Sequence, residues 1–213
     1  MTTVVVSGGP LTPAEVLAVA RGGARVELAG LAHERMARAR AQVEALAAAQ
    51  HPVYGVSTGF GGLALRHVEP DLRARLQSSL VRSHAAGMGP PVEREVVRAM
   101  MLLRLRTLAS GHAGVRPIAA EALAALLNRG ITPVVPEHGS LGCSGDLAPL
   151  AHVALVLMGE GEAAGPDGAV RPAGELFREH GLAPLALAAK EGLSLVNGTD
   201  GMLGMLVLAC ADL

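Results

Sequence analysis

Apolar residues recur at helical spacing along most of this 213-residue chain. Between residues 31 and 49, Met36, Val43 and Leu46 fall on one side of a helix, and charged residues occupy much of the rest. The same spacing predicts helices over residues 69–85, 91–109, 117–128, 146–158 and 176–179, with another opening at Thr12-Pro13. A short strand is expected at residues 4–7, and the polar, glycine-rich stretch 159–174 is expected to be a surface excursion. The pattern therefore predicts a mainly α fold.

The last segment has no polar face. From residue 201 to residue 211 every position is apolar or glycine, so a helix there needs neighbours on all sides. The run is too short to cross a bilayer. We expect it to be covered by another subunit or by the continuation of a longer chain, and we favour the second.

Composition narrows the function classes. Half of the residues are hydrophobic and only 1% are aromatic, which favours helices packed through small side chains. The net charge of −1 gives no indication of a nucleic-acid or membrane partner. Cys143 and Cys210 are too few for a disulfide framework, and no secretory signal opens the chain, so a cytoplasmic location is expected. The histidines lack metal-site spacing, so we expect no metal.

The run Gly142-Cys143-Ser144-Gly145-Asp146 has the most specific chemistry. In a tight bend, the amide nitrogen of Gly145 can attack the carbonyl carbon of Cys143. Loss of water from that ring and from Ser144 then leaves an electron-poor methylene. Glycine suits the attack because it tolerates strained dihedrals. A hydrolase reaction using Ser144, Asp146 and His152 is disfavoured, because no strand precedes the serine and the flanking pattern of a nucleophile elbow is missing.

Three further residues have both a structural and a functional interpretation. Tyr54 begins a glycine-rich loop, where it is a packing residue or an acid/base. His84 ends a predicted helix, where it is a C-terminal cap or a substrate contact. Asn197 or Thr199 caps the last helix, or Asn197 anchors a bound carboxylate or the modified backbone. Taken one at a time, none of these residues favours the functional interpretation.

Taken in order, the motifs carry a resemblance. They are YGVSTGFG at 54–61, SHAAGMG at 83–89, LASGHAGVRP at 108–117, GSLGCSGDLAPLAH at 139–152 and KEGLSLVNGT at 190–199. Together they resemble the histidine ammonia-lyases, within the aromatic amino acid lyase family, over essentially the whole chain. Members of that family carry a methylidene-imidazolone (MIO) prosthetic group.

The resemblance implies a reaction and a set of roles. Cys143-Ser144-Gly145 would form the MIO electrophile without metal or diffusible cofactor, and would capture the amino group of L-histidine. Tyr54 would take the β-proton, giving trans-urocanate and ammonia in histidine degradation. His84 would contact the substrate side chain, and Asn197 would hold the MIO ring and the substrate.

The resemblance also implies an architecture, which is the N-terminal part of the aromatic ammonia-lyase fold. Residues 1–110 would form a loop-and-helix domain carrying the Tyr54 loop, and residues 111–213 would begin a central helical bundle. The assembled enzyme would be a homotetramer.

This chain departs from the family pattern in three ways. Cys143 stands where the family usually has alanine, and Asp200 stands where it often has glutamine. Family members are also substantially longer, so we expect the chain alone to be inactive. A tyrosine ammonia-lyase or aminomutase remains an alternative, and so does a non-catalytic oligomerising fragment.

Overall fold

The structure is a computed structural model that describes residues 2–49, 51–139 and 145–213. Its α-helices are α1 (Pro13–Ala20), α2 (Gly30–Ala48), α3 (Arg73–His84), α4 (Arg94–Ala109), α5 (Pro117–Asn128), α6 (Leu147–Leu157), α7 (Ala173–His180), α8 (Glu191–Val196) and α9 (Asp200–Asp212). Its strands are β1 (Thr3–Val6), β2 (Arg25–Leu28), β3 (Met88–Pro91), β4 (Thr132–Pro133), β5 (Pro136–His138), β6 (Glu162–Ala164) and β7 (Val170–Pro172). Two short 3₁₀ turns, η1 (Gly61–Leu63) and η2 (Pro70–Leu72), complete the described elements. The prediction of a mainly α fold is confirmed.

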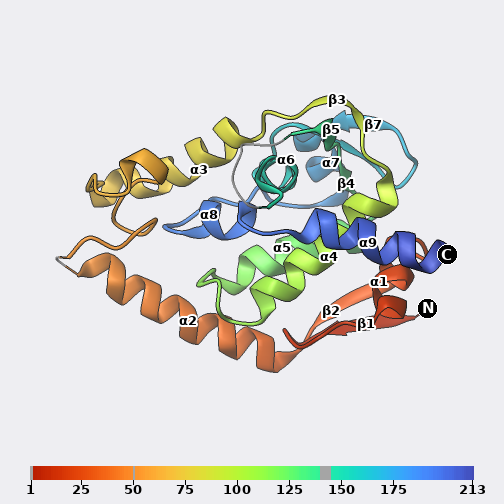
Figure 1. The fold of residues 1–213 in the computed structure, drawn as a ribbon, viewed down its shortest axis with the longest axis horizontal. Helices are drawn as coiled ribbons and strands as arrows, with labels where there is room; N and C mark the ends of the chain where they lie inside the picture. The colour runs from red at the N-terminus through yellow and green to blue at the C-terminus, as the bar shows by residue number, and fades with distance from the viewer. Residues whose placement is uncertain (1, 50, 140–144) are drawn as a thin grey trace.

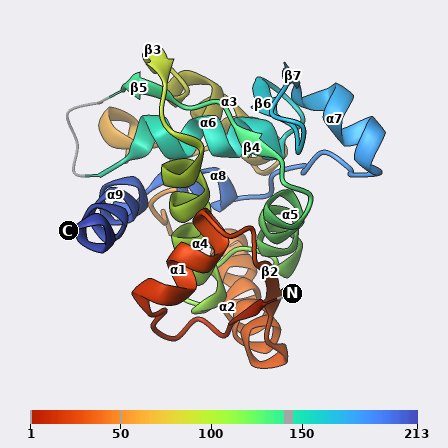
Figure 2. The same cartoon turned by 90° about the vertical axis from the view of Figure 1, so that its right-hand side faces the viewer.

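The hydrophobic core is centred on α4. This helix contacts α1, α2, α5 and α9, and Figures 1 and 2 both show α9 lying alongside it. Met101, Leu102 and Leu105 are completely buried because apolar residues surround the helix on every side. Two charged residues, Arg98 and Arg104, are also buried in it. Arg98 donates to the carbonyls of Val19 and Leu127, so α4 is tied to the ends of α1 and α5.

The strands form three small sheets. β1 pairs with β2 in parallel, in the register Thr3 to Arg25. β3 pairs with β5 antiparallel, and β4, β6 and β7 form a three-stranded antiparallel sheet. The expectation of a surface excursion over 159–174 is wrong in part. That stretch forms the β6–β7 hairpin, and Ala163 is fully buried because β6 also pairs with β4.

Most of the predicted helices are confirmed, with shifted starts: the helix predicted over residues 69–85 begins at Arg73, after η2, and the one predicted over 176–179 begins at Ala173. α2 and α5 lie where the apolar spacing placed them. Thr12 and Glu15 form the reciprocal capping box that opens α1. The helix predicted to begin at residue 91 begins at Arg94 instead. Pro91 is instead the last residue of β3. The amide of the next residue, Val92, donates to the carbonyl of Val135, which keeps this stretch extended.

One side of α9 packs on α4, through buried Gly201, Gly204 and Leu208. On the other side Met202 and Leu206 are more than half exposed, so the described residues cover only part of this apolar helix. Glu191–Asp212 has the length and composition of a membrane span, a test that core helices also pass. The segment is two helices, α8 and α9, joined by an irregular stretch.

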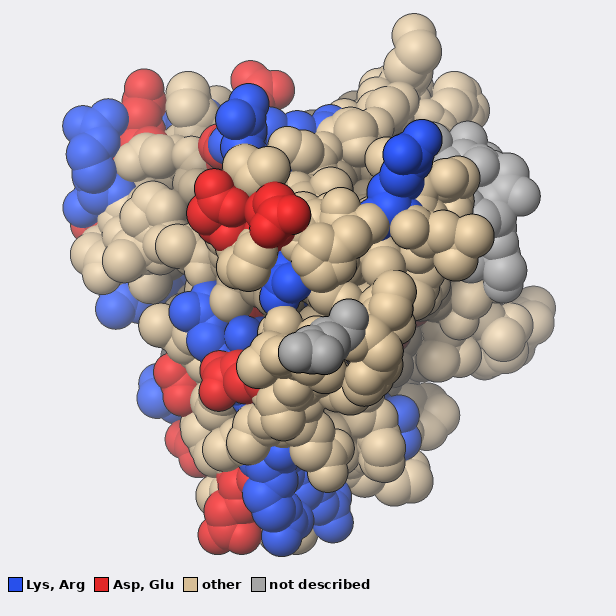
Figure 3. Space-filling model, turned by 90° about the vertical axis from the view of Figure 1, so that its left-hand side faces the viewer, with Lys and Arg blue, Asp and Glu red and all other residues tan. Residues whose placement is uncertain are grey.

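One face of the molecule carries charged side chains of both signs. Figure 3 shows acidic and basic residues interspersed over one face of the molecule, next to broad uncharged areas. This agrees with the net charge of −1 and gives no indication of an extended nucleic-acid surface.

A buried carboxylate joins two of the sequence motifs. Glu191, at the start of α8, is completely buried. Its oxygens accept hydrogen bonds from the amide, Nε and Nη2 of Arg116, at 2.9, 2.9 and 2.7 Å, and from the amide of Ala188 at 2.8 Å. Burial alone would raise the pKa of Glu191, but these bonds hold the pKa below its ordinary value. The ionised pair therefore fixes the loop before α5 to the start of α8.

Replacing Glu191 by glutamine should lower the free energy of unfolding by about 3 kcal/mol at neutral pH, because Arg116 loses its charged partner. The folded-state pKa is lowered, so this stabilisation is present above the ordinary pKa of 4.5 and is lost as the pH falls through the folded value. Urea unfolding from pH 7 to pH 3 measures both effects, with the exposed Glu34→Gln as control. Equal stability of E191Q and E34Q at pH 7 would contradict the role of this pair.

Candidate active site

A cavity of about 300 Å³ contains Tyr54, His84 and Asn197, whereas Gly145, the other predicted site residue that the structure describes, is not part of its lining. Its lining residues are Tyr54, Phe60, Gly61, Leu80, His84, Leu147, Leu193, Val196 and Asn197. They come from the glycine-rich loop before η1, the end of α3, the first residue of α6, and α8 with the residue after it. Tyr54, His84 and Asn197 thus share one cavity although they are far apart in the sequence.

Tyr54 is held by its own loop. Its phenolic oxygen accepts a hydrogen bond from the amide of Gly61 at 3.3 Å, and its ring meets Phe60 edge-on at a centroid distance of 6.2 Å. Ser57 and Thr58 are buried beneath, which anchors the loop while the tyrosine stays 52% exposed. The amide of Gly61 and the ring of Phe60 thus fix the position of the phenolic oxygen. The packing interpretation and the acid/base interpretation are therefore compatible.

His84 is fixed by the end of α3. Its Nδ1 lies 2.9 Å from the carbonyl of Leu80 and 3.0 Å from the hydroxyl of Ser83. Because a carbonyl only accepts, Nδ1 carries the hydrogen, and in the neutral ring Nε2 is left as an acceptor. The helix-cap interpretation is confirmed, and the second ring nitrogen remains available at the cavity.

A buried arginine supports the break between α8 and α9. Arg104 of α4 donates from Nη1 to the carbonyls of Ser194 and Asn197, at 3.2 and 3.0 Å, and its Nη2 pairs with the carboxylate of Asp200. Burial raises the pKa of Asp200, and the guanidinium of Arg104 opposes that shift. The pair thus holds the backbone carbonyl of Asn197 and the start of α9 on the core helix.

Gly198 fits between this ion pair and Gly145, the described end of the predicted tripeptide. A side chain on Gly198 would overlap the guanidinium of Arg104. The carbonyl of Gly198 accepts the amide hydrogen of Asp146 at 2.6 Å. The same carbonyl occupies the space that a side chain on Gly145 would need. Gly145 itself has φ +112°, a conformation that favours glycine. Cys143 and Ser144, the other two residues of the predicted tripeptide, lie outside the described residues.

Asp146 caps α9 from a distant part of the chain. Its carboxylate accepts hydrogen bonds from the amides of Gly201 and Met202, at 2.7 and 3.1 Å. The prediction that Asn197 or Thr199 caps this helix is therefore wrong. The disfavoured hydrolase arrangement gains no support either, because Nε2 of His152 accepts from the amide of Gly87 at 3.1 Å. Burial lowers the pKa of His152, which favours the neutral ring.

Sequence analysis missed Arg104 altogether and left Asp200 and Asp146 without a role. The available signal was a single charged residue inside the apolar run Met100-Met101-Leu102-Leu103-Arg104-Leu105. A charge in such a run is buried with the helix and requires a partner. Nothing local identifies that partner, because Asp200 is 96 residues away.

Comparison with known proteins agrees with this geometry. Residues 11–213 match the aromatic amino acid lyase family. Histidine ammonia-lyase of Streptomyces avermitilis is 68% identical over the whole chain, and tyrosine ammonia-lyase of Cupriavidus metallidurans is 50% identical over 94% of it. The chain covers 42% and 38% of those two proteins, so it spans well under half of their length. The crystal structure of tyrosine aminomutase from Streptomyces globisporus superposes with a TM-score of 0.92 at 43% identity, over 99% of this chain and 39% of that one.

Replacing Gly198 by alanine should destabilise the protein by about 3 kcal/mol or more, because the methyl group would displace Arg104 from its buried partner. Chemical denaturation measures the change. Gly30→Ala is the matched control, since nothing lies within 4 Å of a Cβ there. We expect that control to stay within about 0.5 kcal/mol of the parent or to be more stable. A G198A protein as stable as G30A would show that Arg104 does not need this space.

Proposed function

Because this chain belongs to the aromatic amino acid lyase family, we propose that it carries the electrophile-forming segment and part of the substrate pocket of a histidine ammonia-lyase. The proposed reaction is the elimination of ammonia from L-histidine to give trans-urocanate. The main supporting observation is the single cavity that contains Tyr54, His84 and Asn197. Gly145 is two residues before the lining residue Leu147 and lies against Gly198, which follows the lining residue Asn197.

The described end of the tripeptide fits an MIO group. Gly145 adopts a left-handed φ and has no space for a side chain, as a residue whose nitrogen closes a tight ring requires. Formed from Cys143, Ser144 and Gly145, the group would supply an electrophile that turns the substrate amino group into a leaving group. The bond from the amide of Asp146 to Gly198 and the Arg104–Asp200 pair hold the C-terminal side of the segment in place.

Tyr54 is proposed to accept the β-proton of the substrate. A β-hydrogen is a poor acid, so a positioned base is needed while the amino group leaves. The amide of Gly61 holds the phenolic oxygen, and the edge-on contact with Phe60 orients the ring. The 52% exposure of Tyr54 in this chain leaves the oxygen accessible to a substrate.

His84 is proposed to select the substrate side chain. With Nδ1 bonded to Leu80, the neutral ring presents Nε2 as an acceptor, which suits the N–H of a substrate imidazole. Asn197 is proposed to hold the substrate and the prosthetic group from the opposite wall of the cavity. Its backbone carbonyl is bonded to Arg104, so the position of the residue is set by the core.

A tyrosine ammonia-lyase or aminomutase is the second candidate. The observation in its favour is the similarity to relatives that carry those names, at 50% and 43% identity. The acceptor at His84 would also take a phenolic hydroxyl, so the substrate must be decided by assay.

We also propose a homo-oligomer, a tetramer in the complete cytoplasmic enzyme. The half-exposed apolar side of α9, with Met202, Met205 and Leu206, supports burial of this helix in a larger assembly. A non-catalytic oligomerising role for the 213-residue chain would use the same surface.

The function is tested with two proteins. One is the chain alone, and the other is the chain continued by the remaining part of the Streptomyces avermitilis relative, joined after Leu213. Each is incubated with L-histidine or L-tyrosine, and the absorbance of urocanate or coumarate is followed. We expect urocanate from the joined protein and no turnover from the chain alone. Coumarate without urocanate would contradict the proposed substrate.

Tyr54→Phe tests the proposed base in the joined protein. It keeps the ring against Phe60 and removes only the hydroxyl, so turnover should fall by about a hundredfold or more while folding is unchanged. Intact mass should still show the loss of two water molecules that MIO formation requires. The exposed Ser79→Ala on α3 is the control. Turnover of Y54F equal to that of S79A would exclude Tyr54 as the base.

A further inference from the structure

A second cavity lies outside the proposed active site. It encloses about 430 Å³ between α2 and the turn that follows α4. Its lining residues are Gly8, Arg35, Arg38, Ala39, Gln42, Ser110, Gly111 and His112. The turn belongs to the motif LASGHAGVRP, to which the proposed reaction gives no role.

Two glycines set the shape of this cavity. Gly8 has φ +83°, and a side chain there would meet the backbone carbonyl of Ala109. Gly111 has φ +81°, and its Cβ would lie 2.7 Å from the Cβ of Arg35. The segments around Gly8, Arg35 and Gly111 therefore approach more closely than side chains on the two glycines would permit. Their backbones form part of the cavity wall.

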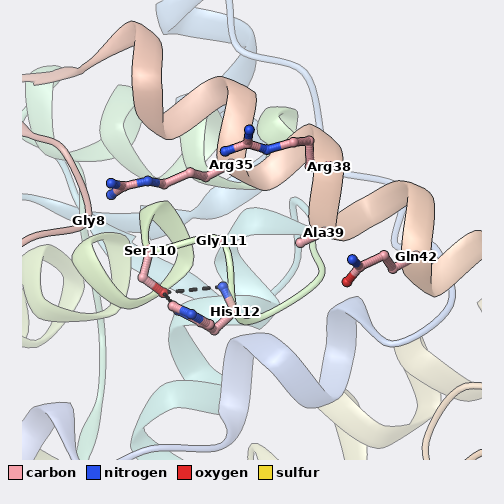
Figure 4. A pocket seen from close by; sticks show the side chains of 8 residues that line it. All are labelled: Gly8, Arg35, Arg38, Ala39, Gln42, Ser110, Gly111 and His112. Carbon is pink, nitrogen blue, oxygen red and sulfur yellow. Dashed lines mark hydrogen bonds between the residues drawn. The ribbon is translucent and has the colours of Figure 1, made fainter.

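The polar groups of the cavity are mostly hydrogen-bond donors. Figure 4 shows Arg35, Arg38 and Gln42 along α2, with Ser110 and His112 facing them across the opening. Arg35 donates to the carbonyl of Ser7, and the lining contains no carboxylate. Within the described residues, neither arginine forms an ion pair. The residues that line the cavity therefore contribute positive charge and no negative charge.

The imidazole of His112 has a defined orientation. The hydroxyl of Ser110 lies 3.3 Å from the amide of His112 and 3.2 Å from its Nδ1. The same hydroxyl donates to the carbonyl of Thr107 at 2.7 Å, so in its bonds to His112 the serine oxygen is the acceptor. Nδ1 is engaged at the serine, and Nε2 lies on the opposite edge of the ring.

We propose that this cavity, which we call the Arg38 pocket, binds a tetrahedral oxyanion, namely inorganic phosphate or the phosphate group of a metabolite. Guanidinium groups form the strongest charge-assisted hydrogen bonds with such anions. The arginines donate from the α2 wall, and with Nδ1 of His112 donating to Ser110 the neutral ring offers Nε2 as an acceptor on the facing wall. A phosphate that carries one hydroxyl can therefore meet both walls, because its charged oxygens accept from the arginines and its hydroxyl donates to His112. A planar carboxylate presents two oxygens along one edge and satisfies only one wall. The volume leaves room for a small group beyond the phosphate.

The proposal is tested by isothermal titration calorimetry of the purified chain with inorganic phosphate, at constant ionic strength in chloride. Saturable binding is expected, and Arg38→Ala and His112→Ala should each weaken it by about tenfold. Arg75→Ala is the matched control, because Arg75 is also an exposed helical arginine and its removal changes the net charge equally. The control should bind phosphate as the parent does.

Parallel titrations with a phosphomonoester and with acetate identify the ligand class. Tighter binding of the phosphomonoester assigns the pocket to a metabolite, equal binding assigns it to free phosphate, and preferential binding of acetate overturns the tetrahedral assignment. No saturable phosphate binding, or equal weakening by R75A and R38A, would also overturn the proposal. Circular dichroism of each variant confirms folding, and Arg38→Gln replaces R38A if that variant is unfolded. These outcomes do not depend on lyase activity.

Discussion

The ion pair between Arg104 and Asp200 is the interaction on which the arrangement of the proposed active site depends. An arginine inside the buried part of α4 is costly to bury, and a carboxylate together with backbone carbonyls offsets that cost. Those carbonyls belong to the irregular stretch that joins α8 to α9. The contacts that offset the burial of Arg104 therefore fix the backbone at Asn197 and Gly198. Gly198 in turn holds the amide of Asp146, directly after the tripeptide.

Other buried contacts join the sequence motifs to one another. Glu191 joins α8 to Arg116 in the loop before α5, and the ammonium group of Lys190 donates to the carbonyl of Ala113 in the same loop. Lys190 has φ +72°, and no other non-glycine residue in the described part of the chain has a positive φ. Such a conformation persists only where the surrounding contacts determine it. The motifs 108–117 and 190–199 thus form one unit, and the Tyr54 loop and α3 meet that unit across the cavity.

Local pattern predicted much of this fold. Apolar spacing located α2 and α5, and the Thr12 capping box located the start of α1, because these features depend on residues a few positions apart. The β6–β7 hairpin and the capping of α9 by Asp146 depend on long-range contacts, which periodicity does not contain. The site residues also divide into those found by local pattern and those that depend on long-range contacts. Tyr54, His84 and Asn197 were found as members of motifs, whereas Arg104 and its partner required the packing of α4 against α9. The Arg38 pocket is a further example, since two close glycine contacts create it.

The Arg104–Asp200 pair holds the backbone beside the segment that is proposed to form the MIO group. Hydrogen exchange at the amide of Asp146, followed by NMR, tests it most directly, because that amide is bonded to Gly198. We expect slow exchange in the parent chain and fast exchange in Asp200→Asn, with amides in the middle of α5 protected equally in both. Fast exchange at Asp146 in the parent, or unchanged protection in D200N, would contradict the account.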